Sequence, residues 1–308
     1  MSNIQAIIMY PYGGIEPSTE REKLFHELLK CVKISKQVPI VVVNRDTEIK
    51  IPTTQLMLSN IDNIKILRTW SVDTCQMWLA GWGHVIDMQE SGDPEFVDIS
   101  RVVLLPGDLE KKDKDFFKKL EAFIGLQKEC DILIGDFASE EIFGGKTLID
   151  QYGTYPLLAN WFPKETIEIL KTLKRPRSEF LNIEINALKR LLMYRKFAYE
   201  QTLSILIRVF DQKKRFGTFS IESYDLGVFE DAKNNREKYR GALDQVERME
   251  RLLKFLWRDM EAPEADSDDL DRVFANTYSR LIQYSSSICE NARIAIGNLL
   301  DVIPYFNN

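Results

Sequence analysis

The stretch from Arg101 to Phe137 constrains the fold of this chain more than any other segment. It begins with a short apolar run, continues through an acidic turn and an amphipathic helix, and ends with a second apolar run. Short apolar runs joined by a helix with a period near 3.6 residues are typical of a βαβ unit in a parallel sheet. Ligands of open α/β sheets bind beyond the carboxyl ends of the strands, where both acidic turns of this stretch lie. Asp108 and Asp136, in those turns, are therefore the first candidates for functional residues.

Apolar runs of the same kind precede this stretch. Residues 4–10, 38–43 and 64–67 predict three further strands, and helical patterns follow the first and the third of them. The helical pattern after the third strand is interrupted by Gly81 and Gly83. Turns at the ends of the first two strands are rich in glycine or polar residues, a composition typical of sites where the backbone approaches a ligand. We therefore expect an α/β fold with a mostly parallel sheet and flanking helices.

The second half of the chain is less regular. We expect a loop at residues 139–163 that crosses the mouth of the sheet, a short helix at 166–173, two buried helical segments within 179–208, and a strand at 218–223. From about Glu230 onward, charged residues alternate with a helical apolar stripe, which predicts a helical hairpin whose second helix runs from Leu270 to about Leu300. The predicted domains are therefore 1–228, an α/β catalytic domain, and 229–308, a C-terminal α-helical extension that docks on the sheet or forms a homodimer surface.

Composition excludes several classes of protein. The chain has 308 residues, 41 basic and 47 acidic side chains and a net charge of −6, so no global field would attract nucleic acid. Four scattered cysteines and two histidines argue against a zinc site and for reduced thiols. We expect a cytoplasmic protein without a transmembrane segment, because no apolar run approaches the length of a membrane span.

Carboxylates at strand ends are the strongest candidates for chemistry. Asp108 could hold Mg²⁺ or Mn²⁺, because hard cations prefer oxygen ligands and keep positions open for substrate phosphates. The alternative is that Asp108 caps a helix beginning near Lys112. Asp136 could act as a general base, or it could be an ordinary turn residue.

The order of the elements resembles a known family. IIMYPYGG, IVVVNRDTE, WLAGWGHVIDM and VVLLPGDLE are similar, in this order, to four segments of GT-A fold glycosyltransferases, especially the family 2 enzymes that resemble dolichol-phosphate-mannose synthase. The resemblance spans roughly residues 4–225 and includes an acceptor-side segment that begins near Glu179. Pro106 stands where that family has the first aspartate of its Asp-x-Asp motif, and Asp108 matches the second.

This resemblance implies a glycosyltransferase that moves a sugar from a nucleoside-diphosphate sugar to an acceptor hydroxyl, with Mg²⁺ or Mn²⁺ bound at Asp108. Of the implied general bases, Asp136 ranks first, before Glu179 and Glu200. The resemblance also places the nucleotide sugar against Pro11, Tyr12, Gly13, Asn44, Arg45, Asp46, Trp82 and Gly83.

Other side chains have a functional and a structural interpretation. Tyr12, Trp70 and Trp82 could stack on a base or sugar, or they could be core residues. Three basic side chains in loops could contact phosphates, or they could simply be solvated: Lys146, Arg175 and Arg177. His84 is expected to be a partly buried helix residue rather than a catalytic one.

Two other functions stay open. A sugar nucleotidyltransferase would need a glycine-rich loop containing lysine after the first strand, and PYGGIEPSTEREK supplies this only in part. A non-catalytic binding or assembly protein with a GT-A-like fold is favoured by Pro106. Such a protein would use its C-terminal helices to bind partners. In the glycosyltransferase these helices could touch a membrane surface peripherally.

Overall fold

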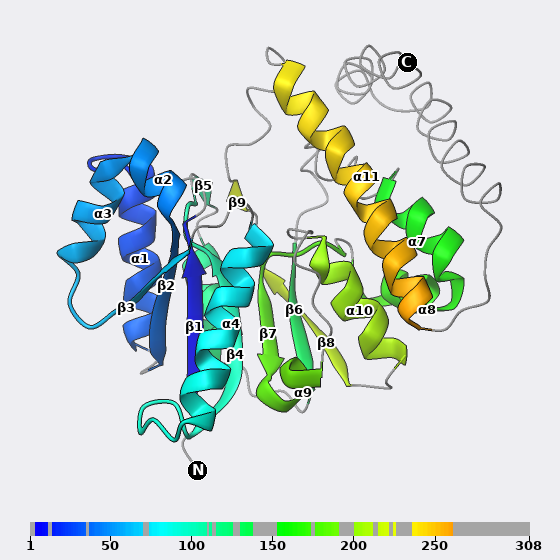
Figure 1. The fold of residues 1–308 in the computed structure, drawn as a ribbon, viewed down its shortest axis with the longest axis horizontal. Helices are drawn as coiled ribbons and strands as arrows, with labels where there is room; N and C mark the ends of the chain where they lie inside the picture. Colours follow the sequence, from blue (N-terminus) through cyan, green and yellow to red (C-terminus); the bar gives the residue numbers. More distant parts are fainter. Residues whose placement is uncertain are drawn as a thin grey trace.

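A seven-stranded sheet runs through the centre of the molecule in the order β3-β2-β1-β4-β7-β6-β8 (Figure 1). Its strands are β1 Ile4–Tyr10, β2 Val38–Asn44, β3 Lys65–Thr69, β4 Ile99–Pro106, β6 Ile132–Phe137, β7 Leu181–Glu184 and β8 Phe216–Ile221. A short ribbon pairs β5 Lys111–Lys112 with β9 Tyr224–Asp225. The computed structural model describes residues 4–11, 14–34, 37–69, 74–109, 111–112, 115–125, 130–137, 153–173, 176–190, 200–211, 215–221, 224–225 and 236–260.

All strands of the large sheet run in one direction except β7, which is antiparallel to both of its neighbours, β4 and β6. The prediction of a mostly parallel sheet is therefore confirmed. The carboxyl ends of the six parallel strands meet at one edge, the upper edge in Figure 1, near the β5–β9 ribbon. Tyr10 at the end of β1 pairs with Pro106 at the end of β4, so the first and fourth strands end level with each other.

Alternation along the strands divides the core into two layers, one on each face of the sheet. On one face, strand residues pack with α1 Glu20–Ile34, α3 Pro52–Ser59 and α5 Phe116–Gly125. On the other face they pack with α4 Thr74–Glu90, α7 Tyr155–Trp161, α8 Pro163–Thr172, α10 Gln201–Asp211 and α11 Arg236–Asp259. Ile7 and Val41 belong to the first layer, whereas Ile8 and Val42 belong to the second. Both faces are apolar because helices cover both, as expected for a largely parallel sheet.

The helix α4 is continuous, whereas the sequence predicted an interruption at its glycines. A Cβ atom on Gly81 would lie 2.9 Å from two carbon atoms of Ile8 and 3.2 Å from a methyl of Val42. The glycine therefore lets the helix approach the sheet closely instead of breaking it. Burial against the sheet outweighs the weak helix propensity of this residue.

Three predictions about local structure are wrong. The polar residues after β2 form helix α2, Arg45–Lys50, instead of a turn, because the helix begins directly at the strand end. Part of the loop predicted at 139–163 is helix α7, which carries a proline in its first turn, where its missing N–H is not needed. The first of the two helical segments predicted within 179–208 contains strand β7, followed by α9 Ile185–Arg190. The expected strand near 218–223 is confirmed as β8, which begins slightly earlier.

Helix α11 confirms the first half of the predicted C-terminal hairpin. Its apolar stripe is buried in the same core layer as α7 and α10. The buried members of the stripe are Val246, Met249, Leu252, Leu253 and Leu256. The second predicted helix, from Leu270 to about Leu300, lies outside the described residues, and the boundary at 228/229 stays a prediction. Within the residues that the structure describes, no helix is long and apolar enough to span a membrane.

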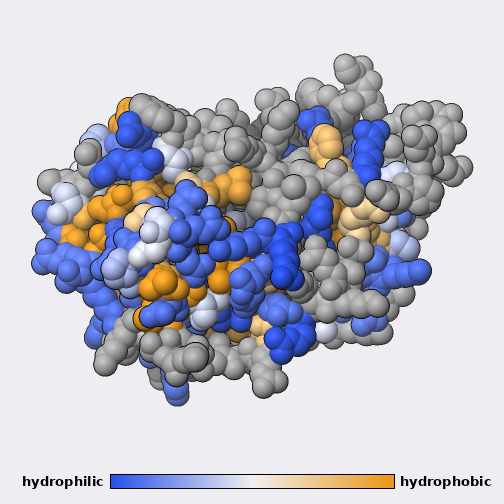
Figure 2. Space-filling view, turned by 60° about the horizontal axis from the view of Figure 1, so that its bottom comes forward, coloured by the Kyte–Doolittle hydropathy of each residue, from blue (hydrophilic) through white to orange (hydrophobic). Residues whose placement is uncertain are grey.

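The surface of the β1–β3 half mixes apolar and polar groups. Figure 2 shows apolar patches there that are separated by hydrophilic side chains. Among the described residues, the large apolar side chains that are strongly exposed lie on separate elements: Ile49, Val97 and Phe255. Apolar residues exposed singly are normal for a protein surface.

Candidate active site

The turns that follow β1 and β4 touch each other at the carboxyl edge of the sheet. The backbone N–H of Gly107 donates to the carbonyl of Tyr10 at 3.2 Å. A Cβ atom at Gly107 would lie 2.9 Å from the backbone nitrogen of Pro11, which cannot move aside. Glycine is therefore required there, and it places the half-buried Asp108 beside the end of β1. Because helix α5 begins only at Phe116, Asp108 is not its N-cap.

The antiparallel strand β7 brings a second carboxylate to this edge. Ile134 pairs with Leu181, and the N–H of Gly135 donates to the carbonyl of Phe180 at 2.9 Å. Asp136 follows Gly135 and Glu179 precedes Phe180, so the two residues flank this hydrogen bond. Both are buried, Asp136 at 9% and Glu179 at 6% exposure. Their role as general bases stays a prediction.

A tyrosine fixes the backbone of this acidic pair. The hydroxyl of Tyr10 donates to the carbonyl of Glu179 at 3.3 Å, which joins β1 to the segment before β7. The Tyr10 ring packs edge-on against Trp78, with 5.7 Å between ring centroids, and Trp78 packs against Trp82 at 5.9 Å. The sequence did not identify Tyr10 as a site residue, and its only signal was its position as the last residue of an apolar strand.

The prediction that Trp82 stacks on a ligand is wrong for this structure. Trp82 is only 2% exposed, because it lies in the core layer between α4 and the sheet. The neighbouring Gly83 faces away from the sheet, since a Cβ atom there would meet nothing within 4 Å. The glycine helix therefore contributes packing, and neither residue lies at the carboxyl edge.

The nucleotide side of the predicted site lies at the ends of β1 and β2. Pro11 is buried after β1, and its carbonyl accepts a hydrogen bond of 3.0 Å from the N–H of Gly14. Asn44 is buried as the last residue of β2, and the half-buried Arg45 begins α2. The predicted residues Tyr12 and Gly13 and the side chain of Asp46 lie outside what the structure describes, as do Trp70, Lys146 and Arg175.

An ion pair between a buried carboxylate and an exposed arginine holds α2 in place beside these residues. Glu48 on α2 is 8% exposed, and both of its carboxylate oxygens accept from Nε of Arg68 on β3 at 3.2 Å. A buried carboxylate such as that of Glu48 is favourable only when it is paired and hydrogen-bonded. The pair therefore fixes the start of α2, and with it Arg45, relative to the edge strand.

The prediction that Glu200 is a general base is wrong for this structure. Its side chain is fully buried, and Oε1 accepts from Arg248 Nη2 at 3.1 Å and from Nε at 3.2 Å. A carboxylate committed to an arginine in this way is not available to take a proton from an acceptor. Arg177 is likewise committed: it is 7% exposed and its Nη1 donates to Gln245 Oε1 at 3.2 Å.

Two other titratable side chains belong to the scaffold. Burial and the nearby charge of Lys65 lower the pKa of His84, whose ring packs edge-on against Phe96 at 5.4 Å. This confirms the expectation of a partly buried histidine. Burial raises the pKa of the Cys31 thiol to about 12, so the thiol stays protonated and is a poor nucleophile at neutral pH.

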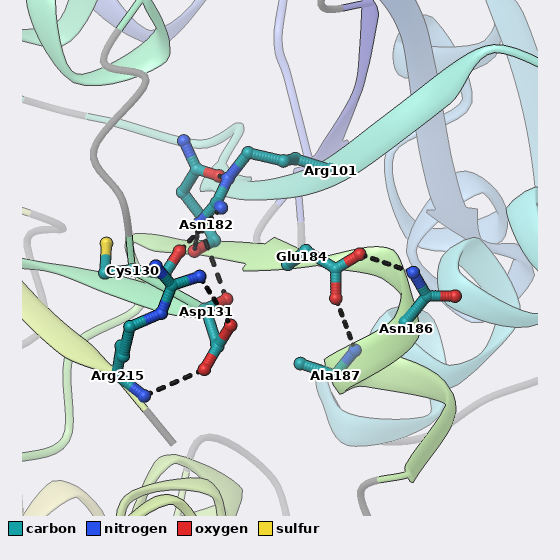
Figure 3. Close-up of polar contacts among 8 residues, drawn as sticks. All are labelled: Arg101, Cys130, Asp131, Asn182, Glu184, Asn186, Ala187 and Arg215. Atoms are coloured by element: carbon teal, nitrogen blue, oxygen red, sulfur yellow. Dashed lines mark hydrogen bonds and ion pairs between the residues drawn. The ribbon is translucent and has the colours of Figure 1, made fainter.

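A buried arginine ties the central strands together at the opposite edge of the sheet (Figure 3). Arg101 on β4 donates from Nε and Nη2 to Asn182 on β7, at 2.6 and 2.9 Å, and from Nη1 to the carbonyl of Cys130 at 2.8 Å. Burial lowers the pKa of Arg101, and these hydrogen bonds compensate the buried charge. Asp131 accepts from the backbone N–H of Arg215 at 2.8 Å, which adds β8 to the network. Strand β7 is thereby held between β4 and β6.

The candidate metal ligand at the carboxyl edge is a single carboxylate, Asp108. Among the described residues, no three histidine, cysteine, aspartate or glutamate side chains gather to hold a metal. Mg²⁺ bound by one or two carboxylates takes its remaining ligands from water and substrate phosphates. Asp108, half-buried at the end of β4, could supply one such carboxylate.

The strand order and the single antiparallel strand between β4 and β6 define a GT-A type of fold, a Rossmann-like sheet with helices on both faces. The resemblance inferred from the sequence is therefore confirmed at the level of fold. No protein-family model matches the sequence, and no curated protein matches it significantly.

Solved structures of glucosyl-3-phosphoglycerate synthase from Mycobacterium tuberculosis share this fold. The complex with phosphoglyceric acid aligns with a TM-score of 0.54 and 14% identity, covering 85% of this chain and 82% of that chain. The complex with Mn²⁺, UDP-glucose and phosphoglyceric acid has the same TM-score and identity, with 85% and 81% covered. The complex with Mn²⁺, UDP and glucosyl-3-phosphoglycerate has a TM-score of 0.52 and 13% identity, with 85% and 82% covered.

Proposed function

We propose that this protein is a glycosyltransferase that moves a sugar from a nucleoside-diphosphate sugar to an acceptor hydroxyl with the help of a divalent metal ion. The observation that carries the proposal is the set of acidic residues at the carboxyl edge: Asp108 after β4, and Asp136 and Glu179 on either side of the Gly135–Phe180 hydrogen bond. Ligand sites of open α/β sheets lie at this edge. The shared fold with synthases solved with UDP-glucose and Mn²⁺ supports a uridine nucleotide as the first donor to test.

The proposed roles follow from position. Asp108 would hold the metal, and Pro11, Asn44 and Arg45 at the neighbouring strand ends would contact the nucleotide. A bound Mg²⁺ or Mn²⁺ would supply neutralisation of the negative charge on the diphosphate leaving group.

Asp136 would be the general base that takes the proton of the acceptor hydroxyl while the hydroxyl oxygen attacks the anomeric carbon, whose bond to the nucleoside diphosphate breaks. Glu179 would then be its neighbour on the acceptor side. The solved synthases were crystallised with phosphoglyceric acid, which makes a small phosphorylated hydroxy acid the first acceptor to test.

Nucleotide binding with and without metal is the direct test. We expect the wild-type chain to bind UDP and UDP-glucose more tightly with Mn²⁺ than without it, as measured by isothermal titration calorimetry. Asp108→Asn should weaken the Mn²⁺-dependent binding about tenfold or more, a loss of roughly 1.4 kcal/mol, because the amide removes the charge that attracts the ion. Release of UDP in the presence of phosphoglyceric acid and other hydroxyl acceptors would then identify the reaction.

Asp98→Asn is the matched control, because Asp98 is exposed and lies just before the opposite end of the same strand. Its nucleotide affinity should equal that of the wild type. If UDP-, GDP- and ADP-sugars all fail to bind at any metal concentration, the transferase proposal is wrong. That outcome would favour a non-catalytic protein, the alternative suggested by Pro106 at the first position of the metal motif.

A further inference from the structure

Polar side chains of α11 contact the segment that carries the proposed acceptor side of the site. Gln245 accepts a hydrogen bond from Arg177, which lies just before β7, at 3.2 Å. One turn further along the helix, Arg248 donates two hydrogen bonds to one oxygen of Glu200, at 3.1 and 3.2 Å. Both contacts join residues that are far apart in the sequence. Together they form what we call the α11 latch: Gln245 with Arg177, and Arg248 with Glu200.

A short chain of hydrogen bonds leads from the latch to the strand that bears Asp136. Next to Glu200, Thr202 donates from Oγ1 to the carbonyl of Ser178 at 3.0 Å. Ser178, which follows Arg177, donates from Oγ to the carbonyl of Gly135 at 2.5 Å and accepts from the N–H of Phe180 at 3.1 Å. Gly135 directly precedes Asp136. The latch is thus separated from the proposed base by two buried hydroxyl groups.

Burial gives these contacts their importance. The side chain of Glu200 has no exposed surface, and Ser178 and Thr202 are also fully buried. Removing the partner of a buried charge leaves that charge uncompensated, so the surrounding structure must rearrange or the group must be neutralised. In contrast, the apolar stripe of α11 would stay buried if the helix rotated or shifted slightly. The polar contacts therefore define the rotation and register at which α11 packs.

We propose that Gln245 and Arg248 are positioning residues, through which α11 holds the segment before β7, and therefore Asp136 and Glu179, in the geometry needed for transfer. The catalytic meaning of this proposal rests on the proposed function. Residues 236–260 would then help to shape the acceptor side of the site, although they lie beyond residues 4–225, whose sequence resembles the glycosyltransferase family. Precise placement of a base is a large contribution to rate, and a small displacement is costly.

The test compares two arginines on the same helix. Arg248→Gln removes the charge that faces Glu200, whereas Arg251→Gln makes the same chemical change at a side chain that is 64% exposed and pairs with Glu247 on the surface. Arg248→Lys keeps the positive charge beside Glu200 and should therefore behave nearly like the wild type. Gln245→Ala is a milder variant that tests the same latch if Arg248→Gln does not fold.

Hydrogen exchange of individual amides is the first measurement, because it does not depend on activity. In Arg248→Gln the amides of Gly135 and Phe180 should exchange about tenfold faster or more than in the wild type, because local opening becomes easier. The amides of β2, including Val41, should keep their wild-type rates. Arg251→Gln should match the wild type at all of these positions.

Kinetics provide the second measurement. In Arg248→Gln the affinity for UDP with Mn²⁺ should stay within about twofold of the wild type, while kcat for sugar transfer falls about tenfold or more. Unchanged exchange rates at Gly135 and Phe180 in Arg248→Gln would overturn the latch. An equal increase of the exchange rates in β2 would also overturn it, because α11 would then contribute only global stability. A wild-type chain that neither binds UDP nor transfers a sugar would instead contradict the proposed function, and the exchange comparison would still decide whether the latch exists.

Discussion

Two buried acidic residues, Asp136 near the end of β6 and Glu179 just before β7, flank the hydrogen bond from the N–H of Gly135 to the carbonyl of Phe180. Glu200 has the same side-chain type as Glu179 but is occupied by an arginine. Residue type alone therefore did not distinguish the candidates, because all three are compatible with a general base. The ion pair of Glu200 with Arg248, which depends on tertiary structure, is what excludes Glu200.

A comparison of Asp136 with Glu179 tests the assignment of the base. We expect Asp136→Asn to lower kcat for sugar transfer by about 10²–10⁴-fold, because an amide cannot accept the proton of the acceptor hydroxyl. Glu179→Gln should have a smaller effect. UDP affinity, measured by calorimetry with Mn²⁺, should be unchanged in both variants, since the proposed nucleotide site is at the ends of β1 and β2. A larger loss of kcat in Glu179→Gln than in Asp136→Asn would reverse the two roles.

Among the elements, strands were predicted well where an apolar run determines them. Strands β1, β2, β4 and β6 are short and almost entirely apolar, and few other structures would bury them. Strand β7 was missed because LNIE is short and its apolar residues also fit a helical period that continues into α9. Only its pairing with β4 and β6 identifies it as a strand. The position of Glu179 beside Asp136 depends on this strand, so the arrangement of the candidate site was missed with it.

The two glycines of α4 give a matched test of element packing. Gly81→Ala should lower the free energy of unfolding by about 1–3 kcal/mol, because its Cβ would overlap Ile8. Gly83→Ala should raise it by about 0.5–1 kcal/mol, because alanine is the better helix former and the space there is open. Urea denaturation measures both values. Stabilisation by both substitutions would mean that α4 lies further from the sheet than described here.

At the scale of the whole molecule, the core layer on the α4 face continues from β1 and β2 to α11. Buried residues of α11 pack together with α7 and α10, and Trp257 lies against Trp161 with 5.7 Å between ring centroids. Such continuity favours one cooperative unfolding transition. The predicted domain boundary at 228/229 separates α11 from the rest of this core layer in the sequence. Unfolding experiments can decide whether α11 also unfolds separately.

Two substitutions on α11 test this continuity. Leu253→Ala should cost about 2–4 kcal/mol of unfolding free energy, because it leaves a cavity in a fully buried site. Tryptophan fluorescence and far-UV circular dichroism should still show one shared transition at a lower denaturant concentration. Phe255→Ala is the control: its side chain is 47% exposed, so the cost should be below about 1 kcal/mol. Two separate transitions would instead support an independently folded C-terminal extension.

The sequence by itself determined the fold class and Asp108 as a candidate ligand, because strand periodicity and the residues at strand ends are local properties. It also determined that α11 is a helix, since apolar residues at a regular helical spacing fit few other structures. Only the tertiary structure decided that β7 runs antiparallel between β4 and β6, and that Glu200 and Trp82 are scaffold residues. These outcomes depend on contacts between segments far apart in the chain, which no local pattern encodes.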